Sequence, residues 1–277
     1  MLIDLLQETV LNNRNDLNFP LLRNLLKETL QLQTLNFIYN SKYGKNFLFK
    51  GGTCLRFCFD LPRLSEDLDF DIKEWDKFSL TDFTEAMTKY FRENQQFRDF
   101  NTKIAGNKRE IFLQFNVMKK LGLADRDESD KLFLRIDISP LDSRFYKEEL
   151  SIKSTPDFSL VIKRYSLEDL FASKIAAIIQ RSFKKGKGNL ITFKGRDYFD
   201  LIWFLEKRVV PNWERLKEIT GLTTKEKIVR ALEEKVASIK TEYLQEDLLP
   251  LFKESSFVNN FTKNFSSLYK SYKQVLL

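Results

Sequence analysis

The first third of the chain switches between the helical and the strand pattern of apolar positions. Before residue 45, apolar residues recur every three or four positions, which predicts amphipathic helices over 2–13 and 20–41. An apolar run at 47–49 predicts a short strand, and a glycine pair then leads into a helix of one to two turns. Strict alternation of polar and apolar residues over 67–72 predicts a second strand.

The remaining sequence divides into a strand-rich and a helical part. A helix is expected over 81–93, neighbouring strands at 111–118 and 132–139, a loop over 140–156 and a strand at 158–162. Ser166 followed by Asp169 predicts a helix start, and further helices are expected at 212–220, 225–239, 243–252 and 258–275. We therefore predict an α/β (α+β) fold: a mixed sheet flanked by helices, with an all-helical C-terminal half and domains 1–165 and 166–277.

Composition excludes several kinds of active site. The chain has no histidine, so Ser-His-Asp and Cys-His catalysis and histidine-bound zinc are ruled out, and any metal should be an oxygen-bound one such as magnesium or manganese. The net charge of +7 permits a polyanionic partner without requiring one. Cys54 and Cys58, four residues apart among apolar neighbours, are expected to be reduced core residues. We find no signal peptide or membrane span, and we expect a cytoplasmic protein.

Two neighbouring motifs point to a nucleotide and a metal. Asp67, Asp69 and Asp71 share one strand face, where their charges repel unless a cation compensates them. Gly51 and Gly52 precede a helix start, where backbone N–H groups and the helix dipole favour a phosphate. Thr53 is expected to cap that helix. Each motif alone is more often a plain turn or a solvated face, but their order and spacing together favour phosphate and metal binding.

These residues carry a resemblance to a known family. The stretches Lys50-Gly51-Gly52-Thr53-x-Leu55 and Arg63-x-Ser65-x-Asp67-x-Asp69-Phe70 resemble the signature of the AbiEii nucleotidyltransferases. These enzymes are toxins of abortive-infection and toxin–antitoxin pairs, and they are similar to the MenT toxins. The general pattern has Gly-Ser where this chain has Gly52-Thr53, and threonine keeps the hydroxyl. The segments 166–177 and 195–201 resemble downstream sequence blocks of the same family. The resemblance implies functional roles for Lys174 and Asp197, and in second place for Asp200.

A third carboxylate is predicted from strand alternation. Arg135, Asp137 and Ser139 share the polar face of the strand at 132–139, and Asp137 would lie beside Asp67 and Asp69 if the two strands are neighbours. Nucleotidyltransferases commonly use such an acid to activate the attacking hydroxyl or to hold a second metal. A surface aspartate without such a role explains the same pattern.

The second half of the chain offers a lysine and a basic segment. Lys174 falls within an apolar helical stripe, so it needs an anionic partner, either a triphosphate or a structural pair with Asp197 or Asp200. Asp200 is alternatively a structural anchor. The lysines and glycines of 181–189, followed by Lys194 and Arg196, are expected either to grip RNA phosphates or to form a solvated loop.

The resulting hypothesis is a transfer of a nucleoside monophosphate from an NTP to an acceptor hydroxyl. The resemblance favours RNA, with tRNA first, as the acceptor and a cognate antitoxin as the protein partner. Catalysis is assigned to Asp67, Asp69, Asp137, Lys174 and Asp197, and the metal, Mg²⁺ or Mn²⁺, to the first three of these. The nucleotide is assigned to Lys50, Gly51, Gly52, Thr53, Ser65 and Lys174. The alternatives are a metal-dependent nuclease using Asp69-x-Asp71-x-Lys73 and a non-catalytic module that binds RNA or protein.

Overall fold

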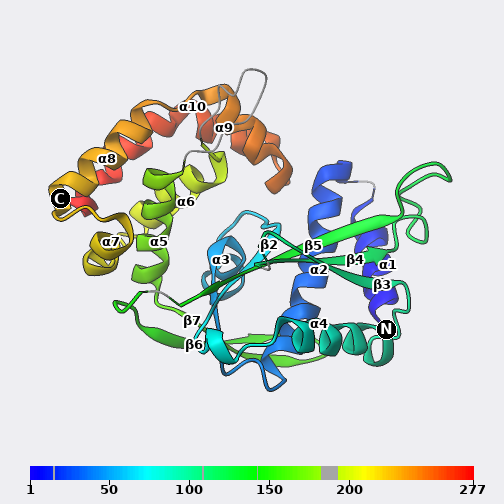
Figure 1. Cartoon of the computed structure of the whole chain (residues 1–277). Coiled ribbons are helices and arrows are strands. Elements are labelled where there is room, and N and C mark those ends of the chain that lie inside the picture. The colour runs from blue at the N-terminus through cyan, green and yellow to red at the C-terminus, as the bar shows by residue number, and fades with distance from the viewer. Residues whose placement is uncertain (15, 108, 142, 182–192) are drawn as a thin grey trace. The chain divides into compact units, whose positions relative to one another are not determined.

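The computed structural model describes residues 1–14, 16–107, 109–141, 143–181 and 193–277, and Figure 1 shows their helices and strands. The first helices are α1 (Leu2–Asn13), α2 (Phe19–Tyr39), α3 (Gly51–Phe59) and α4 (Leu80–Lys89). The strands are β1 (Phe47–Lys50), β2 (Asp67–Ile72), β3 (Phe100–Ala105), β4 (Glu110–Asn116), β5 (Lys131–Pro140), β6 (Glu148–Ser154) and β7 (Ser159–Tyr165). The later helices are α5 (Leu167–Gln180), α6 (Gly195–Glu206), α7 (Trp213–Thr220), α8 (Lys225–Ala237), α9 (Thr241–Leu248) and α10 (Ser255–Tyr272).

The chain divides into two compact units, one formed by Met1–Leu141 with Leu150–Arg164 and the other by Asp142–Glu149 with Tyr165–Leu277. The strands form one sheet in the order β3-β4-β5-β2-β1-β7-β6 (Figure 1). The pairs β2–β5 and β1–β7 are parallel, whereas β1–β2, β3–β4 and β4–β5 are antiparallel. After β7 the described chain is helical. The predicted mixed α/β fold with a helical C-terminal half is confirmed.

One face of the sheet forms the core of the first unit. Every second residue of β2 and β5 is buried there: Leu68, Phe70, Ile72, Leu132, Leu134, Ile136 and Ile138. Helices α2 and α4 cover this face with aromatic rings, since Phe83 of α4 stacks on Phe47 of β1 and contacts Phe37 of α2. Because side chains alternate along a strand, the polar residues of β2 and β5 are directed to the opposite face.

Two strands differ from the sequence-based expectation. The region 140–156, predicted as a loop, contains β6, and no strand was predicted where β3 lies. Both strands are at the ends of the sheet order, so each has a neighbouring strand on one side only. Leu150 and Ile152 of β6 are exposed, and the other residues of this strand are charged or small and polar. Edge strands of this composition lack the buried apolar face by which strands are recognised in a sequence.

The second unit begins with the predicted helix cap. Ser166 Oγ accepts a hydrogen bond from the Asp169 backbone N–H, which confirms the start of α5. The Asp169 carboxylate does not return a bond to the Ser166 N–H, as a full capping box would. It accepts the Lys147 backbone N–H and the Asn212 side-chain amide instead.

In the described part of the chain, no helix combines the length and the apolar character that crossing a bilayer requires.

Candidate active site

The polar face of β2 and β5 brings predicted site residues together. In the parallel pairing of these strands, Asp69 is in register with Asp137, and Asp67 is in register with Arg135. Neighbouring strands lie about 5 Å apart, so acids on the same face are close enough to share a ligand. The expectation that the strands of Asp69 and Asp137 are neighbours is therefore confirmed, while the roles of the three acids stay predictions.

Arg135 lies between two of these acids. Its Nη2 is 2.7 Å from Asp67 Oδ2 and 3.1 Å from Asp137 Oδ2. Burial and the nearby Asp69 raise the pKa of Asp137 to about 6, although Arg135 opposes the shift. Asp137 Oδ1 is buried and has no hydrogen-bond partner among the described residues. An acid with this pKa can exchange a proton near neutral pH.

The third carboxylate of β2 has different surroundings. Asp71 is buried, and its Oδ1 lies 2.6 Å from Lys50 Nζ and 2.8 Å from Ser139 Oγ. The repulsion expected among the three aspartates is thus relieved at Asp71 by a lysine from β1. Lys50, which the sequence assigns to the nucleotide, also donates to Ser139 Oγ.

The glycine turn lies directly against Asp69. Gly51 has a φ of +79°, a left-handed backbone conformation that residues other than glycine rarely adopt. A Cβ at this position would overlap Asp69 Oδ2. At Gly52, a Cβ would lie 2.7 Å from Arg63 Nη2 and 2.9 Å from Ser65 Oγ. The two glycines are therefore needed for close approach of the α3 backbone to Asp69, Arg63 and Ser65.

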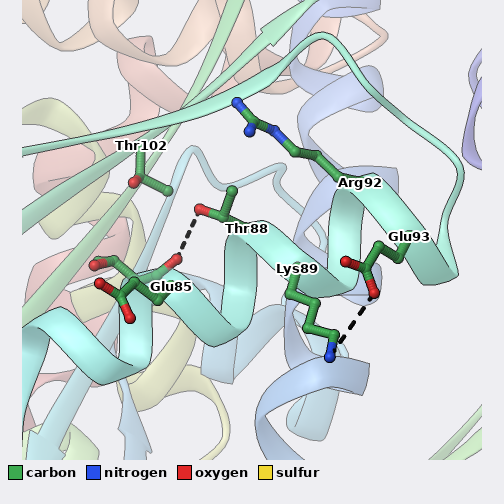
Figure 2. Close-up of a pocket in the computed structure, with 7 residues that line it drawn as sticks. Glu85, Thr88, Lys89, Arg92, Glu93 and Thr102 are labelled. Atoms are coloured by element: carbon green, nitrogen blue, oxygen red, sulfur yellow. Dashed lines mark hydrogen bonds and ion pairs between the residues drawn. The ribbon is translucent and has the colours of Figure 1, made fainter.

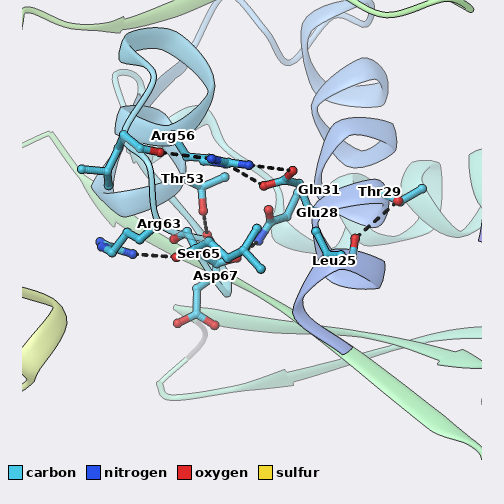
Figure 3. Close-up of polar contacts among 11 residues, drawn as sticks. Leu25, Glu28, Thr29, Gln31, Thr53, Arg56, Arg63, Ser65 and Asp67 are labelled. Atoms are coloured by element: carbon cyan, nitrogen blue, oxygen red, sulfur yellow. Dashed lines mark hydrogen bonds and ion pairs between the residues drawn. The ribbon is translucent and has the colours of Figure 1, made fainter. Parts of the chain in front are cut away.

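Thr53 does not cap α3 as predicted. The helix begins at Gly51 with Lys50 as its N-cap, and Thr53 lies inside the first turn. The Thr53 side chain is fully buried, and its hydroxyl donates to the Asp67 backbone carbonyl (Figure 3). This bond ties the helix to the start of β2, so the threonine has a structural partner within the chain.

The turn between α3 and β2 is held from several sides (Figure 3). The Gln31 side chain of α2 donates to the Ser65 carbonyl, and Arg56 donates to the Leu61 carbonyl. Arg63 is almost fully buried and donates to the Leu64 carbonyl. These bonds fix where β2 begins, and with it the position of Asp67.

Two residues near the site have no role in the sequence-based hypothesis. Arg63 belongs to the quoted signature, and its guanidinium lies against Gly52. Glu110 of β4 is in register with Asp137, so that Glu110, Asp137, Asp69 and Lys50 follow one another across four strands. The signal for Glu110 is strand pairing, which becomes known once the order of the sheet is known.

The predicted residues of the second unit form a buried ion cluster. Lys174 Nζ lies 2.9 Å from Asp197 Oδ1 and 2.8 Å from Asp200 Oδ2, and Arg181 also pairs with Asp197. The Lys174 side chain is 12% exposed, and the two aspartates are more deeply buried. The structural pairing that the sequence allows for Lys174 is therefore present. The basic segment 181–189 lies outside the described residues except for Arg181, whereas Lys194 and Arg196 flank the start of α6.

The donors available for a metal are carboxylate oxygens, which suit magnesium or manganese. In the described chain, no three Cys, Asp or Glu side chains are gathered closely enough to hold an ion as they stand. Arg135 Nη2 lies between two of the three expected ligands, and Asp137 Oδ1 is a buried acceptor that a cation would satisfy. The chemistry of the donor set thus fits a hard divalent ion.

A separate pocket of about 380 Å³ lies along α4 and contains none of the predicted site residues (Figure 2). Its walls are formed by threonines and by charged residues, among them Glu85, Lys89 and Arg92. Lys89 pairs with Glu93 one helical turn away, as expected of a solvated helix face.

Comparisons with known proteins assign the family. No curated protein matches the chain. It is similar to a crystal structure described as a candidate nucleotidyltransferase from H. pylori, at 17% identity and a TM-score of 0.40, over 94% of this chain and 99% of the other. It is also similar to JHP933 from Helicobacter pylori, at 18% identity and a TM-score of 0.39, over 90% and 97%. Likeness at this level carries no argument about the site.

The comparison with protein families is decisive. The model described as "Nucleotidyl transferase AbiEii toxin, Type IV TA system" matches residues 35–273, most of the chain. The matched region includes both signature stretches and the ion cluster of Lys174. The chain therefore belongs to the AbiEii family of nucleotidyltransferase toxins of type IV toxin–antitoxin systems.

Proposed function

We propose that this protein transfers a nucleoside monophosphate from an NTP to an acceptor hydroxyl in a reaction that depends on Mg²⁺ or Mn²⁺. The observation that carries the proposal is the contact of the Gly51–Gly52 turn with Asp69, which is itself in register with Asp137. A helix N-terminus that favours phosphate is thus built against carboxylates that suit a divalent ion.

Different residues of the first unit are proposed to bind the phosphates and the divalent ion. The backbone N–H groups at Gly51 and Gly52 would bind the β- and γ-phosphates, since no side chain of the described protein caps α3. Asp67 and Asp69 would hold the divalent ion, and Asp137 would either share it or accept a proton. When bound, that ion would neutralise the phosphates and polarise the α-phosphorus. Ser65 Oγ, beside Gly52, would donate to a phosphate oxygen.

Asp137 is the proposed proton acceptor. Burial and the nearby Asp69 raise its pKa to about 6 when no ion is bound. Its buried Oδ1, which has no partner among the described residues, is the atom proposed to take the proton of an attacking hydroxyl. Sharing the metal is the alternative role for the same side chain. Lys174 is proposed to steady the departing pyrophosphate, because its ammonium group is a cation that suits a phosphate anion. Asp197, which pairs with Lys174, is proposed as a further functional position on the family resemblance.

The acceptor is proposed to be RNA, with tRNA first, and the protein to act as the toxin of a pair with a cognate antitoxin. Membership of a type IV toxin–antitoxin family supports the existence of an antitoxin. The excess of basic over acidic residues, 46 to 39, is compatible with a polyanionic acceptor.

The test is incorporation of each labelled NTP into total RNA with Mg²⁺ present. Asp69→Asn should reduce incorporation by at least about a hundredfold, because it removes a ligand charge at the proposed metal site. Asp99→Asn is the matched control, since Asp99 is an exposed aspartate of the same unit that pairs with Lys120. Equal labelling by both variants contradicts the proposal. RNA shortened without any NTP would indicate the nuclease alternative instead.

A further inference from the structure

Arg135 is a charged residue of the polar sheet face to which the proposed function gives no task. It lies on β5, in register with Asp67 and two residues before Asp137. A single nitrogen, Nη2, contacts Oδ2 of both acids, at 2.7 Å and 3.1 Å. One terminal nitrogen of the guanidinium therefore bridges carboxylates from two strands.

The remainder of this guanidinium is loosely held. Its Nε is buried and has no hydrogen-bond partner among the described residues, and its ion pairs are made through Nη2. An arginine with a structural role usually engages several of its five donors, often two of them on one carboxylate. The Arg135 side chain is also 31% exposed. It can therefore leave the two acids by rotating its terminal bonds, without the loss of a hydrogen bond elsewhere in the described chain.

The acids that Arg135 contacts are two of the three proposed metal ligands. A divalent ion at Asp67, Asp69 and Asp137 would bind the same two carboxylates that Nη2 now contacts through their Oδ2 atoms. A guanidinium and a divalent ion on the same carboxylates repel each other in a partly buried site. Binding of the ion and the present position of Arg135 therefore disfavour each other.

We propose that Arg135 competes with the divalent cation for Asp67 and Asp137, an inference that rests on the proposed metal site. The guanidinium compensates the carboxylates when the ion is not bound, and the ion competes with it for their charge. A site built in this way holds the cation less tightly than its carboxylates alone would.

The experiment measures Mn²⁺ binding to the full-length protein by electron paramagnetic resonance and calorimetry. Arg135→Gln should lower the Kd for Mn²⁺ by roughly 5- to 20-fold, the effect of removing one nearby competing charge from a partly solvated site. Arg98→Gln is the charge-matched control, because Arg98 is an exposed arginine of the same unit. It should leave the Kd within about twofold of the wild-type value.

A thermal-shift measurement supports the same test if the variant is less stable. In EDTA, Arg135→Gln should melt below the wild type, because Asp67 and Asp137 lose their counter-ion. Mn²⁺ should then raise its melting temperature more than that of the wild type, since tighter binding stabilises more. An unchanged or higher Kd in Arg135→Gln overturns the competition and leaves the metal site standing. Mn²⁺ binding that Asp69→Asn does not reduce overturns the metal site itself.

Discussion

At the scale of the single residue, Gly51 links the backbone to the chemistry proposed for the site. Its positive φ and its contact with Asp69 are separate reasons for a glycine at this position. Gly221 has a similar φ of +71°, but a Cβ there would meet nothing within 4 Å. Comparing an alanine substitution at Gly51 with one at Gly221 therefore separates the cost of backbone strain from the cost of displacing the Asp69 carboxylate.

Gly51→Ala should destabilise the protein by about 2–4 kcal/mol, because strain at positive φ and overlap with Asp69 add together. It should also lower NTP incorporation by more than about tenfold, because Asp69 must move. Urea denaturation and the RNA-labelling assay measure the two effects.

Gly221→Ala is the control for the strain alone. It should cost about 1 kcal/mol and leave incorporation unchanged, since its Cβ points into open space. If both alanine variants lose the same stability and the same activity, contact with Asp69 does not explain the glycine at position 51.

At the scale of the element, three strands are joined by one partly buried polar cluster. Lys50 of β1 contacts Asp71 of β2 and Ser139 of β5, and Ser139 donates to the same Asp71 oxygen. β1 and β5 lie on either side of β2 in the sheet. The cluster therefore fixes the polar face beside Asp69 and Asp137 as well as compensating Asp71.

Lys50→Met should lower the free energy of unfolding by about 2–4 kcal/mol, because it leaves the Asp71 carboxylate buried without its lysine. Asp71→Asn in the same chain should restore part of the loss, since an uncharged amide is cheaper to bury. Urea denaturation of both single variants and the double variant gives the coupling energy. Strictly additive losses would show that the lysine and the aspartate do not stabilise each other.

At the scale of the whole molecule, each unit has its own buried charges. In the first unit they lie on the polar face of the sheet, and in the second Lys174, Asp197 and Asp200 join α5 to α6. The ion cluster joins α5 to α6 whether or not Lys174 also contacts a substrate. A test of Lys174 must therefore report on each unit separately.

Lys174→Met should raise hydrogen exchange in α5 and α6 by an amount equivalent to about 3–5 kcal/mol, because two buried carboxylates lose their lysine. Exchange in β1 and β2 should stay at the wild-type level. Mass spectrometry of peptic fragments resolves the two regions. Lys270→Met, at an exposed position of α10, is the control that should leave both regions unchanged. Unchanged exchange in α5 and α6 would mean that the cluster contributes little stability.

Several parts of the site were predictable because they depend on local pattern. Alternation over 67–72 assigned Asp69 and Asp71 to one strand face, and the glycine pair before a helix start indicated a close backbone approach. Strand β6 could not be found in this way, since its exposed Leu150 and Ile152 lack a buried face. The cap expected at Thr53 failed because the threonine hydroxyl reaches the Asp67 carbonyl, a partner that the helix pattern does not reveal.

The sequence by itself determined most of the helices, though not α6, together with the inner strands, the absence of histidine chemistry and a set of acids near a glycine turn. Each of these follows from residue type and spacing within a short segment. The pairing of β2 with β5 was decided by tertiary structure. It places Asp137 and Arg135 beside Asp69 and Asp67, across a separation of 68 residues. The pairing of β1 with β2 gives Asp71 surroundings different from those of Asp67 and Asp69, because it places Lys50 beside the Asp71 carboxylate. Strand order and register depend on which apolar faces pack together over the whole sheet. They therefore cannot be inferred from the spacing of residues within a short segment.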